Sequence, residues 1–189
     1  MLLVTGPTTI QVLALSGSLR AASLNSALLR VAARVAPANV SIAIYRGLDE
    51  LPLFNPDIES TDPEPVARLR TRIIAADALL IASPEYAHGI TGVLKNALDW
   101  MVGNESFVYK PVALLNASPI SVHAIASLRE IVTTMSAHVI DAASIAVAVR
   151  GYHRSEASIL ADAQVVKALR QALEEIRAAV IAQRANRAQ

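Results

Sequence analysis

The chain has 189 residues, no cysteine and a formal net charge of +1 at pH 7, and 53% of its side chains are hydrophobic. This size and composition predict one compact domain over residues 1–189, and they exclude disulfides, thiolate catalysis and sulfur-ligated metal sites. The near-neutral charge, with its basic residues dispersed, argues against nucleic acid or an anionic membrane as a partner and favours small-molecule chemistry.

Segments with strand and helix patterns alternate along the chain. Residues 1–9 precede the first of them as an N-terminal extension, and residues 184–189 are expected to fray. No stretch reads as a membrane span or a leader, so we expect a cytoplasmic protein. Apolar runs predict strands at residues 10–15, 40–45, 78–82 and 112–116 and within 139–149, and amphipathic patterns predict helices at 24–35, 66–76, 92–102, 122–135 and 162–183.

Five strands alternating with five helices indicate an α/β fold with a parallel sheet and right-handed crossovers. The flavodoxin-like strand order 2-1-3-4-5, with helices on both faces, has its switch point between the first and third strands. Residues 46–65 form a connection that is long for an ordered loop, which suggests a functional or interfacial role.

The first of two motifs follows the first strand and leads into a helix. It provides hydroxyl groups, one amide and one guanidinium, from Ser16, Ser18, Arg20, Ser23 and Asn25. A loop that enters a helix also offers free backbone amides and the positive end of the helix dipole, which suits a phosphate. As the only cation of the segment, Arg20 is expected to contact the FMN phosphate or, alternatively, the 2′-phosphate of NADPH. Ser23 or Asn25 alternatively serves only to cap the helix.

The second motif follows the third strand. Pro84 makes the exit from the strand rigid, Gly89 lets the main chain approach a ligand closely, and Tyr86 is aromatic. These features suit a flat heterocycle, with the backbone amides from Glu85 to His88 directed at the pyrimidine edge of a flavin. Tyr86 is alternatively a core or interface aromatic residue, and His88 is either a cofactor or nicotinamide contact or a rim residue.

The motifs that mark other kinds of ligand-binding site on such a sheet are absent from this sequence. The first loop has Ser16-Gly17-Ser18 in place of a Gly-x-Gly-x-x-Gly fingerprint, and neither a nucleophile elbow nor a Walker motif is present. The serines after the first strand also replace the paired acidic residues of a phosphoacceptor domain. The four histidines are far apart in sequence, so no metal site is expected.

Together with residues 92–100, Gly-Val-Leu-Lys-Asn-Ala-Leu-Asp-Trp, the two motifs resemble the NADPH-dependent FMN reductase family. The resemblance implies tightly bound FMN, with Pro84, Glu85, Tyr86 and Ala87 lining the isoalloxazine ring. It also implies a homodimer or a homotetramer. Lys95, Asp99 and Trp100 are interpreted as helix-face and subunit-contact residues rather than catalysts.

The segment 116–123 departs from the family pattern, because many relatives have a glycine-rich stretch there and this chain does not. Fewer glycines allow less backbone approach to a ligand, so the acceptor side of the site is expected to differ, with Ser118 as a weak candidate contact.

The resemblance predicts hydride transfer from NADPH or NADH, through FMN, to a small acceptor such as a quinone, an azo compound, a metal oxyanion or free flavin. No residue is assigned as a catalytic acid or base, because the cofactor supplies the chemistry. The alternative is an FMN-binding electron carrier or regulator that does not turn over pyridine nucleotide.

Overall fold

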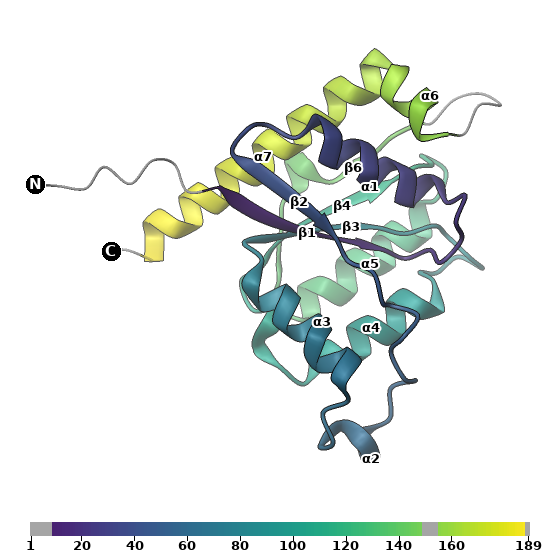
Figure 1. Ribbon diagram of the computed structural model, residues 1–189, viewed down its shortest axis with the longest axis vertical. Coiled ribbons are helices and arrows are strands. Elements are labelled where there is room, and N and C mark those ends of the chain that lie inside the picture. The colour runs from purple at the N-terminus through teal and green to yellow at the C-terminus, as the bar shows by residue number, and fades with distance from the viewer. Residues whose placement is uncertain (1–8, 149–154, 188–189) are drawn as a thin grey trace, which may run out of the picture.

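The computed structural model describes residues 9–148 and 155–187. Figure 1 shows a parallel sheet in the middle of the molecule, with helices packed around it. The strand order is β2-β1-β3-β4-β5, and β6 also pairs with β4. This confirms the predicted α/β class and the order 2-1-3-4-5. The strands are β1 (Ile10–Ser16), β2 (Val40–Ile44), β3 (Ala78–Ala82), β4 (Pro111–Asn116), β5 (His138–Val139) and β6 (Ile145–Ala146).

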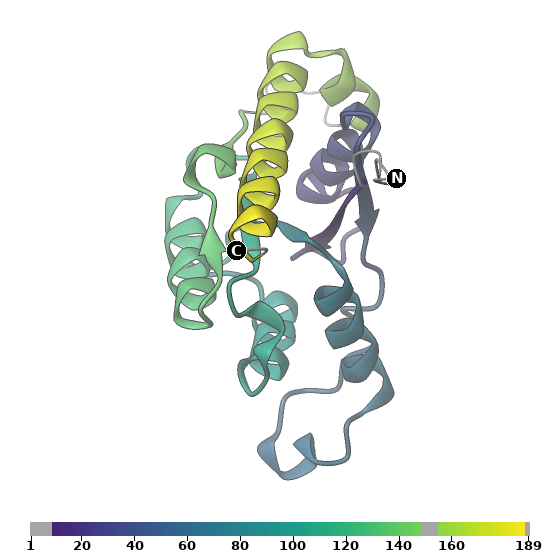
Figure 2. The same cartoon turned by 90° about the vertical axis from the view of Figure 1, so that its left-hand side faces the viewer.

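The helices form a layer on each side of the sheet (Figure 2). One core cluster joins the sheet to α1, α6 and α7, and a second joins it to α3, α4 and α5. The helices are α1 (Leu24–Val35), α2 (Pro56–Glu59), α3 (Glu64–Ala75), α4 (Gly92–Val102), α5 (Val122–Thr134), α6 (Glu156–Ala161) and α7 (Ala163–Arg187), and the 3-10 turns are η1 (Glu105–Phe107) and η2 (Asp141–Ala143).

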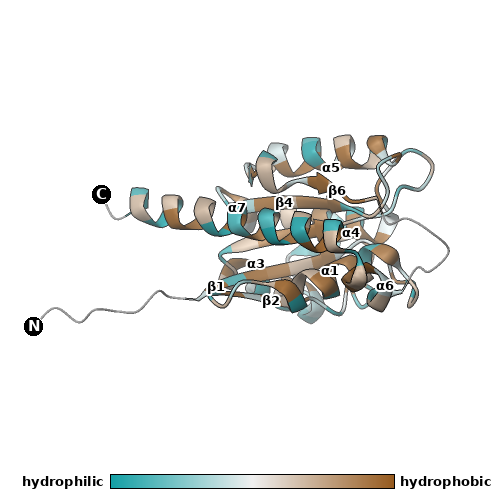
Figure 3. Ribbon diagram, turned by 90° about the horizontal axis from the view of Figure 1, so that it is seen from above, coloured by the Kyte–Doolittle hydropathy of each residue, from teal (hydrophilic) through white to brown (hydrophobic). Residues whose placement is uncertain are grey.

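The central strands are apolar on both faces because helices cover both faces. In β3, Leu80 belongs to the core under α1 and α7, whereas Leu79 and Ile81 belong to the core under α3, α4 and α5. Seen from above in Figure 3, the strands are mostly hydrophobic, and hydrophilic residues recur along α7. The continuous apolar run that predicted a buried strand at residues 78–82 therefore arises because alternate residues of this strand pack into two different hydrophobic cores.

The last strand differs from the expectation of a single strand within residues 139–149. Two strands of two residues each, β5 and β6, pair with successive parts of β4, and η2 separates them. Ser144 accounts for the interruption, because its hydroxyl accepts a hydrogen bond from the backbone amide of Leu114 in β4 (3.1 Å) and donates to the carbonyl of Ile140 (2.9 Å).

The connection over residues 46–65 contains α2 and is held by α4. Trp100 Nε1 and Asn96 Nδ2 both donate to the carbonyl oxygen of Pro52, at 2.8 and 3.0 Å. The Trp100 ring also meets the Phe54 ring edge to face, with centroids 5.1 Å apart. Since Trp100 is only 2% exposed, the expectation that it contacts another subunit is wrong. Trp100 instead anchors this connection to its own domain.

The C-terminal helix is longer and more ordered than expected. It continues to Arg187, and the Arg184 guanidinium pairs with the Asp77 carboxylate at 2.7 Å. The helix therefore extends four residues past its predicted end at residue 183. Residues 188–189, and residues 1–8 of the predicted extension, lie outside the described residues. Within the described ranges, no helix combines the length and apolarity needed to cross a membrane.

Candidate functional site

The turns after β1 and β3 meet at one pocket at the carboxyl edge of the sheet. Its volume is about 340 Å³, and both predicted motifs contribute to its walls. The prediction that the two motifs converge is therefore confirmed. The pocket is lined by Ser18, Arg20, Ala22, Ser23, Leu24, Asn25, Pro84 and Tyr86, whereas Ser16, Glu85, Ala87 and Gly89 do not line it.

A close contact between the two turns sets the shape of this pocket. Gly17 lies against Ser83, and a Cβ on Gly17 would come within 2.5 Å of Ser83 Oγ. Thr91, which is 4% exposed, donates its hydroxyl to the carbonyl of Gly17 at 2.6 Å and also accepts from Leu94 N at the start of α4. The position of Thr91 before a helix predicts a capping role, but no sequence signal indicates its bond to Gly17.

The serines of the first loop are linked to each other. Ser16 and Ser26 share a hydrogen bond between their hydroxyls at 2.7 Å, and Ser18 Oγ accepts from Arg20 N. Ser23 caps α1 by accepting from Ser26 N at 3.2 Å, so the capping alternative holds for Ser23. A hydroxyl that accepts in this way still has its own hydrogen to donate, so capping leaves Ser23 able to bind an anion.

Backbone donors at the start of α1 are unpaired. The amides of Ala22, Leu24 and Asn25 have no hydrogen-bond partner in the described part of the chain. The N-terminus of a helix attracts anions because such amides and the helix dipole act together. The side of the pocket formed by the start of α1 therefore offers unpaired hydrogen-bond donors and a positive helix end, which together suit a phosphate.

Arg20 lies at the boundary of two hollows. It is exposed, and among residues 9–148 and 155–187 no carboxylate pairs with it. It lines the pocket described above and also a neighbouring hollow of about 380 Å³, which Ser16 and Arg46 line as well. Both alternatives for Arg20, the FMN phosphate and the 2′-phosphate of NADPH, are compatible with this position.

Asn25 has a structural role that the sequence did not indicate. Its side-chain oxygen accepts from Ala117 N at 3.1 Å, which ties α1 to the end of β4. The alternative that Asn25 caps α1 is wrong, because Ser23 holds that position. In the glycine-poor segment 116–123, the Asn116 side chain donates to Ser121 O and accepts from Ser118 N. An amide side chain therefore holds this segment in its conformation.

The second loop is a tight reverse turn. Tyr86 and Gly89 exchange two backbone hydrogen bonds of 3.0 Å, and the intervening Ala87 and His88 both have positive φ, at 49° and 60°. The amide of Tyr86 is thus occupied, which corrects the expectation that every amide from Glu85 to His88 faces a ligand. Those of Glu85, Ala87 and His88 have no partner within the described ranges. Tyr86 itself is 60% exposed, which argues against a core position.

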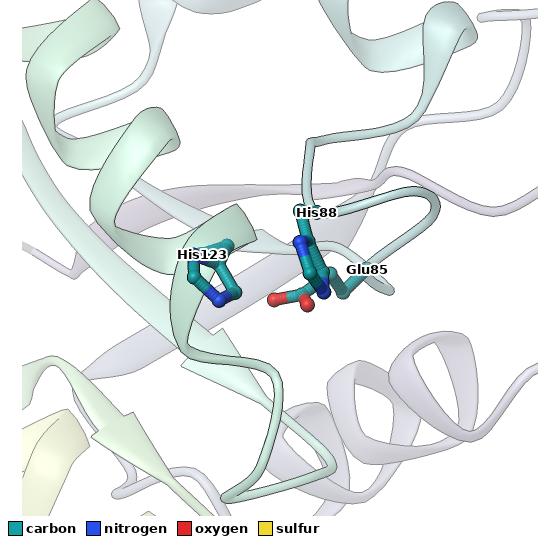
Figure 4. Close-up of side chains that lie close together, drawn as sticks. All are labelled: Glu85, His88 and His123. Carbon is teal, nitrogen blue, oxygen red and sulfur yellow. The ribbon is translucent and has the colours of Figure 1, made fainter.

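Beside this turn, three ionisable side chains converge (Figure 4). The Glu85 carboxylate accepts from Ala124 N at 2.9 Å, and the His88 ring stacks on the His123 ring with centroids 4.2 Å apart. One potential ligand atom from each of Glu85, His88 and His123 lies within 4.8 Å of the others. His88 and His123 are far apart in sequence, as stated above, but the fold brings their rings together.

Comparison with known proteins identifies the family. A family model described as NADPH-dependent FMN reductase matches residues 10–151, which include both motifs and the whole sheet. The chain belongs to this family.

Members of the NADPH-dependent FMN reductase family are among the similar curated proteins. An NAD(P)H-dependent FMN reductase of Pseudomonas aeruginosa is 46% identical over 112 residues, which cover 58% of this chain and 60% of that protein. A quinone reductase of Escherichia coli K12 is 33% identical over 113 residues, with the same coverage. The chain thus matches less than two thirds of the length of these relatives.

Among solved structures of similar fold is FerB, a flavoenzyme NAD(P)H:acceptor oxidoreductase from Paracoccus denitrificans. Its structure matches with a TM-score of 0.73 and 28% identity over 91% of this chain and 96% of FerB. FMN is the flavin of the FMN reductase family and NAD(P)H its co-substrate. The donor set here fits this cofactor, because the first motif lines the pocket with unpaired amides and the Arg20 guanidinium, and the second motif lines it with Pro84 and Tyr86.

Proposed function

We propose that this chain is an FMN-dependent NAD(P)H oxidoreductase that reduces a small acceptor: a quinone, an azo compound, a metal oxyanion or free flavin. The observation that carries the proposal is that one pocket is lined both by anion-binding groups of the first motif and by an aromatic side chain of the second. When bound, FMN supplies the chemistry of accepting hydride from NAD(P)H and passing it on, and the protein binds and orients it.

The phosphate of FMN is proposed to bind at the start of α1. Near neutral pH a phosphate monoester carries close to two negative charges, which the helix dipole and the amides of Leu24 and Asn25 stabilise. The hydroxyls of Ser18 and Ser23 donate to it, and Arg20 provides the positive charge. Ser16 acts indirectly in this proposal, because its hydroxyl is bonded to Ser26 and holds the loop in shape.

The isoalloxazine ring is proposed to lie against the turn after β3. Pro84 and Tyr86 present apolar surface to it. The ring is proposed to extend beyond the pocket along the turn, where the unpaired amides of Glu85 and Ala87 donate to its pyrimidine edge. Gly89 closes the turn through its two bonds to Tyr86. In this arrangement the main chain of the turn, rather than its side chains, recognises the polar edge of the ring.

No side chain is assigned as a catalytic acid or base. The pocket is lined by two serines, one asparagine, one arginine, one tyrosine and three apolar residues, and in this proposal they bind and orient the cofactor. The segment 116–123, shaped by Asn116 and attached to Asn25, is proposed to border the acceptor, and its bulk narrows the choice of acceptor relative to a glycine-rich loop.

Anaerobic mixing of the FMN-loaded protein with NADPH or NADH tests the proposal. Rapid loss of the visible absorbance of oxidised flavin, followed by its return when a quinone is added, is the expected result. A spectrum that stays oxidised would instead support the alternative of an electron carrier or regulator. The net charge of +1 argues against a carrier, since docking to charged partners favours a strongly charged surface.

We also infer a homodimer, or a dimer of dimers, in the cytoplasm. The inference depends on the sequence resemblance, and exposed apolar side chains near α4, Leu53 and Val102, are consistent with it. Lys95 and Asp99 form an ion pair on the exposed face of the same helix and remain available for such a contact. Light scattering measures the assembly directly.

A further inference from the structure

Glu85, His88 and His123 form a cluster whose chemistry the proposed function does not use. Glu85 and His88 belong to the turn after β3, and His123 is the second residue of α5. Figure 4 shows the three side chains directed toward one another from these two elements. One ligand atom from each lies within 4.8 Å of the other two, so rotations about side-chain bonds bring all three within reach of one metal ion.

The fold holds two of these side chains in place by specific backbone features. Ala87 and His88 both have positive φ, which costs free energy in residues other than glycine and is tolerated only where the surroundings enforce it. Figure 4 shows the His88 ring beside the Glu85 carboxylate in this turn. The Glu85 carboxylate is itself anchored by the amide of Ala124, which occupies one oxygen and leaves the other free to accept.

Two imidazoles and one carboxylate are the ligands of open transition-metal sites. Zinc sites with three protein ligands of these types keep a further coordination position for water or another ligand. Imidazole nitrogen favours zinc, copper and nickel over magnesium and calcium, which prefer oxygen ligands. We propose that Glu85, His88 and His123 bind a divalent transition-metal ion of the zinc type, with one coordination position open.

Binding requires the two histidine rings to leave their stack. The rings are 4.2 Å apart with 25° between their planes, whereas a metal ion must lie near the plane of each ring that ligates it. Both side chains are exposed, so rotation about their side-chain bonds meets little resistance. The bound ion then replaces a ring contact with two metal-nitrogen bonds.

A metal at this point links the turn after β3 to the start of α5. Tyr86 lies between Glu85 and His88 in that turn and lines the pocket, so the ion restrains one wall of the pocket from outside. The proposal does not depend on the proposed function, because it uses the side chains of Glu85, His88 and His123, whereas the flavin proposal uses the backbone amides of Glu85 and Ala87.

Equilibrium dialysis of the full-length, FMN-loaded protein against Zn²⁺, followed by elemental analysis, tests the site without optical interference from the flavin. We expect one Zn²⁺ per chain and no comparable binding of Mg²⁺. Removal of one ligand, in His123→Ala or His88→Ala, is expected to weaken Zn²⁺ binding more than about tenfold, since even residues that only support a metal ligand contribute about 10- to 100-fold.

Matched variants separate ligation from other effects. His138→Ala removes an exposed histidine at the amino end of β5, on the opposite edge of the sheet, and is expected to leave Zn²⁺ binding unchanged. Glu85→Gln keeps an acceptor for Ala124 N but loses the charge, so Zn²⁺ binding is expected to fall. Absence of Zn²⁺ binding, or equal binding by His123→Ala and wild type, would overturn the proposal.

A measurement on the unmodified protein guards against misfolded variants. Paramagnetic Cu²⁺ added below one equivalent is expected to broaden the ring-proton NMR signals of His88 and His123 and to leave that of His138 sharp. Broadening of His138 to the same extent, or sharp signals from His88 and His123, would contradict the proposed site.

Discussion

Arg20 is the residue on which the phosphate proposal depends most. Its guanidinium is exposed at the pocket, and no carboxylate among the described residues neutralises it. We expect Arg20→Ala to weaken FMN binding by about 1.5 to 3 kcal/mol, as for a lost hydrogen bond to a charged group. Flavin fluorescence titration of the apoprotein measures this directly.

Two controls give the Arg20 result its meaning. Arg72→Ala removes an exposed arginine of α3 that lines neither hollow beside Arg20 and is expected to leave FMN affinity unchanged. If Arg20→Ala keeps normal FMN affinity but raises KM for NADPH more than for NADH, Arg20 binds the 2′-phosphate of NADPH instead. Arg46→Ala, in the neighbouring hollow, should then act in the same direction.

At the scale of single residues, the sequence predicted which kinds of side chain form the site better than it predicted which distant residues those side chains contact. The serines of the first loop and the cap at Ser23 follow from local rules, because capping depends on neighbours within three residues. The bonds from Asn25 to Ala117 and from Thr91 to Gly17 join distant segments, at separations of 92 and 74 residues. Only the folded chain reveals them.

At the scale of elements, the turn after β1 fits against β3 because position 17 has no side chain. In Gly17→Ala the new Cβ would meet Ser83 Oγ at 2.5 Å and Ser83 Cβ at 2.9 Å, so backbone must move. We expect a loss of about 1 to 3 kcal/mol in the free energy of unfolding, typical of overpacking in a tight contact. Urea denaturation provides the measurement.

Gly92→Ala serves as the matched glycine control. Gly92 begins α4, and nothing lies within 4 Å of a Cβ placed there. Alanine has the higher helix propensity, so the free energy of unfolding should stay the same or rise by up to about 1 kcal/mol. Equal losses in the two variants would show that the contact with Ser83 is unimportant.

Most elements could be predicted, for reasons visible in their patterns. The apolar run of β3 and the amphipathic pattern of α4 are local signals, and their predicted bounds are those of the structure. The break between β5 and β6 was missed because it depends on a side chain, Ser144, taking the amide of Leu114 in place of the backbone. A hydropathy pattern contains no information on such a substitution.

At the scale of the molecule, Glu156 connects α6 to α1. Its carboxylate accepts from Arg30 Nε at 2.7 Å and from Arg34 at 3.3 Å. The hydrogen bond from Arg30 is the largest cause, and it lowers the pKa of Glu156 below its ordinary value. Burial opposes this shift, and the hydrogen bond from Arg34 and the charges of both arginines add to the lowering. A carboxylate with a lowered pKa stabilises the fold above its unfolded pKa, and this contribution is lost as the pH falls through its folded pKa.

We therefore expect Glu156→Gln to lower the free energy of unfolding at pH 7 by no more than about 1 kcal/mol, since the ion pair is partly exposed. The difference between variant and wild type should shrink as the pH falls below the ordinary carboxyl value of 4.5. Urea titrations at neutral and acidic pH test this. A difference that is independent of pH would assign the effect to packing rather than charge.

The arrangement of the whole molecule was predictable where motifs mark it. The motif suited to a phosphate follows the first strand, and the motif suited to a flat ring follows the third. Both can contact one ligand only if these two strands are neighbours in the sheet, and β1 and β3 are paired. The meeting of His88 and His123 was not predictable, because it depends on the path of the turn after β3 and on where α5 starts. Sequence spacing alone therefore did not indicate that these two rings meet.

The broken final strand has a consequence for how molecules meet in concentrated solution. An unbroken border strand displays a continuous row of free amides and carbonyls that another chain can join, which begins fibrous aggregation. Here that border consists of two pieces of two residues each with a 3-10 turn between them. Each of these edge strands is therefore too short for a strand of another molecule to pair along this side of the sheet.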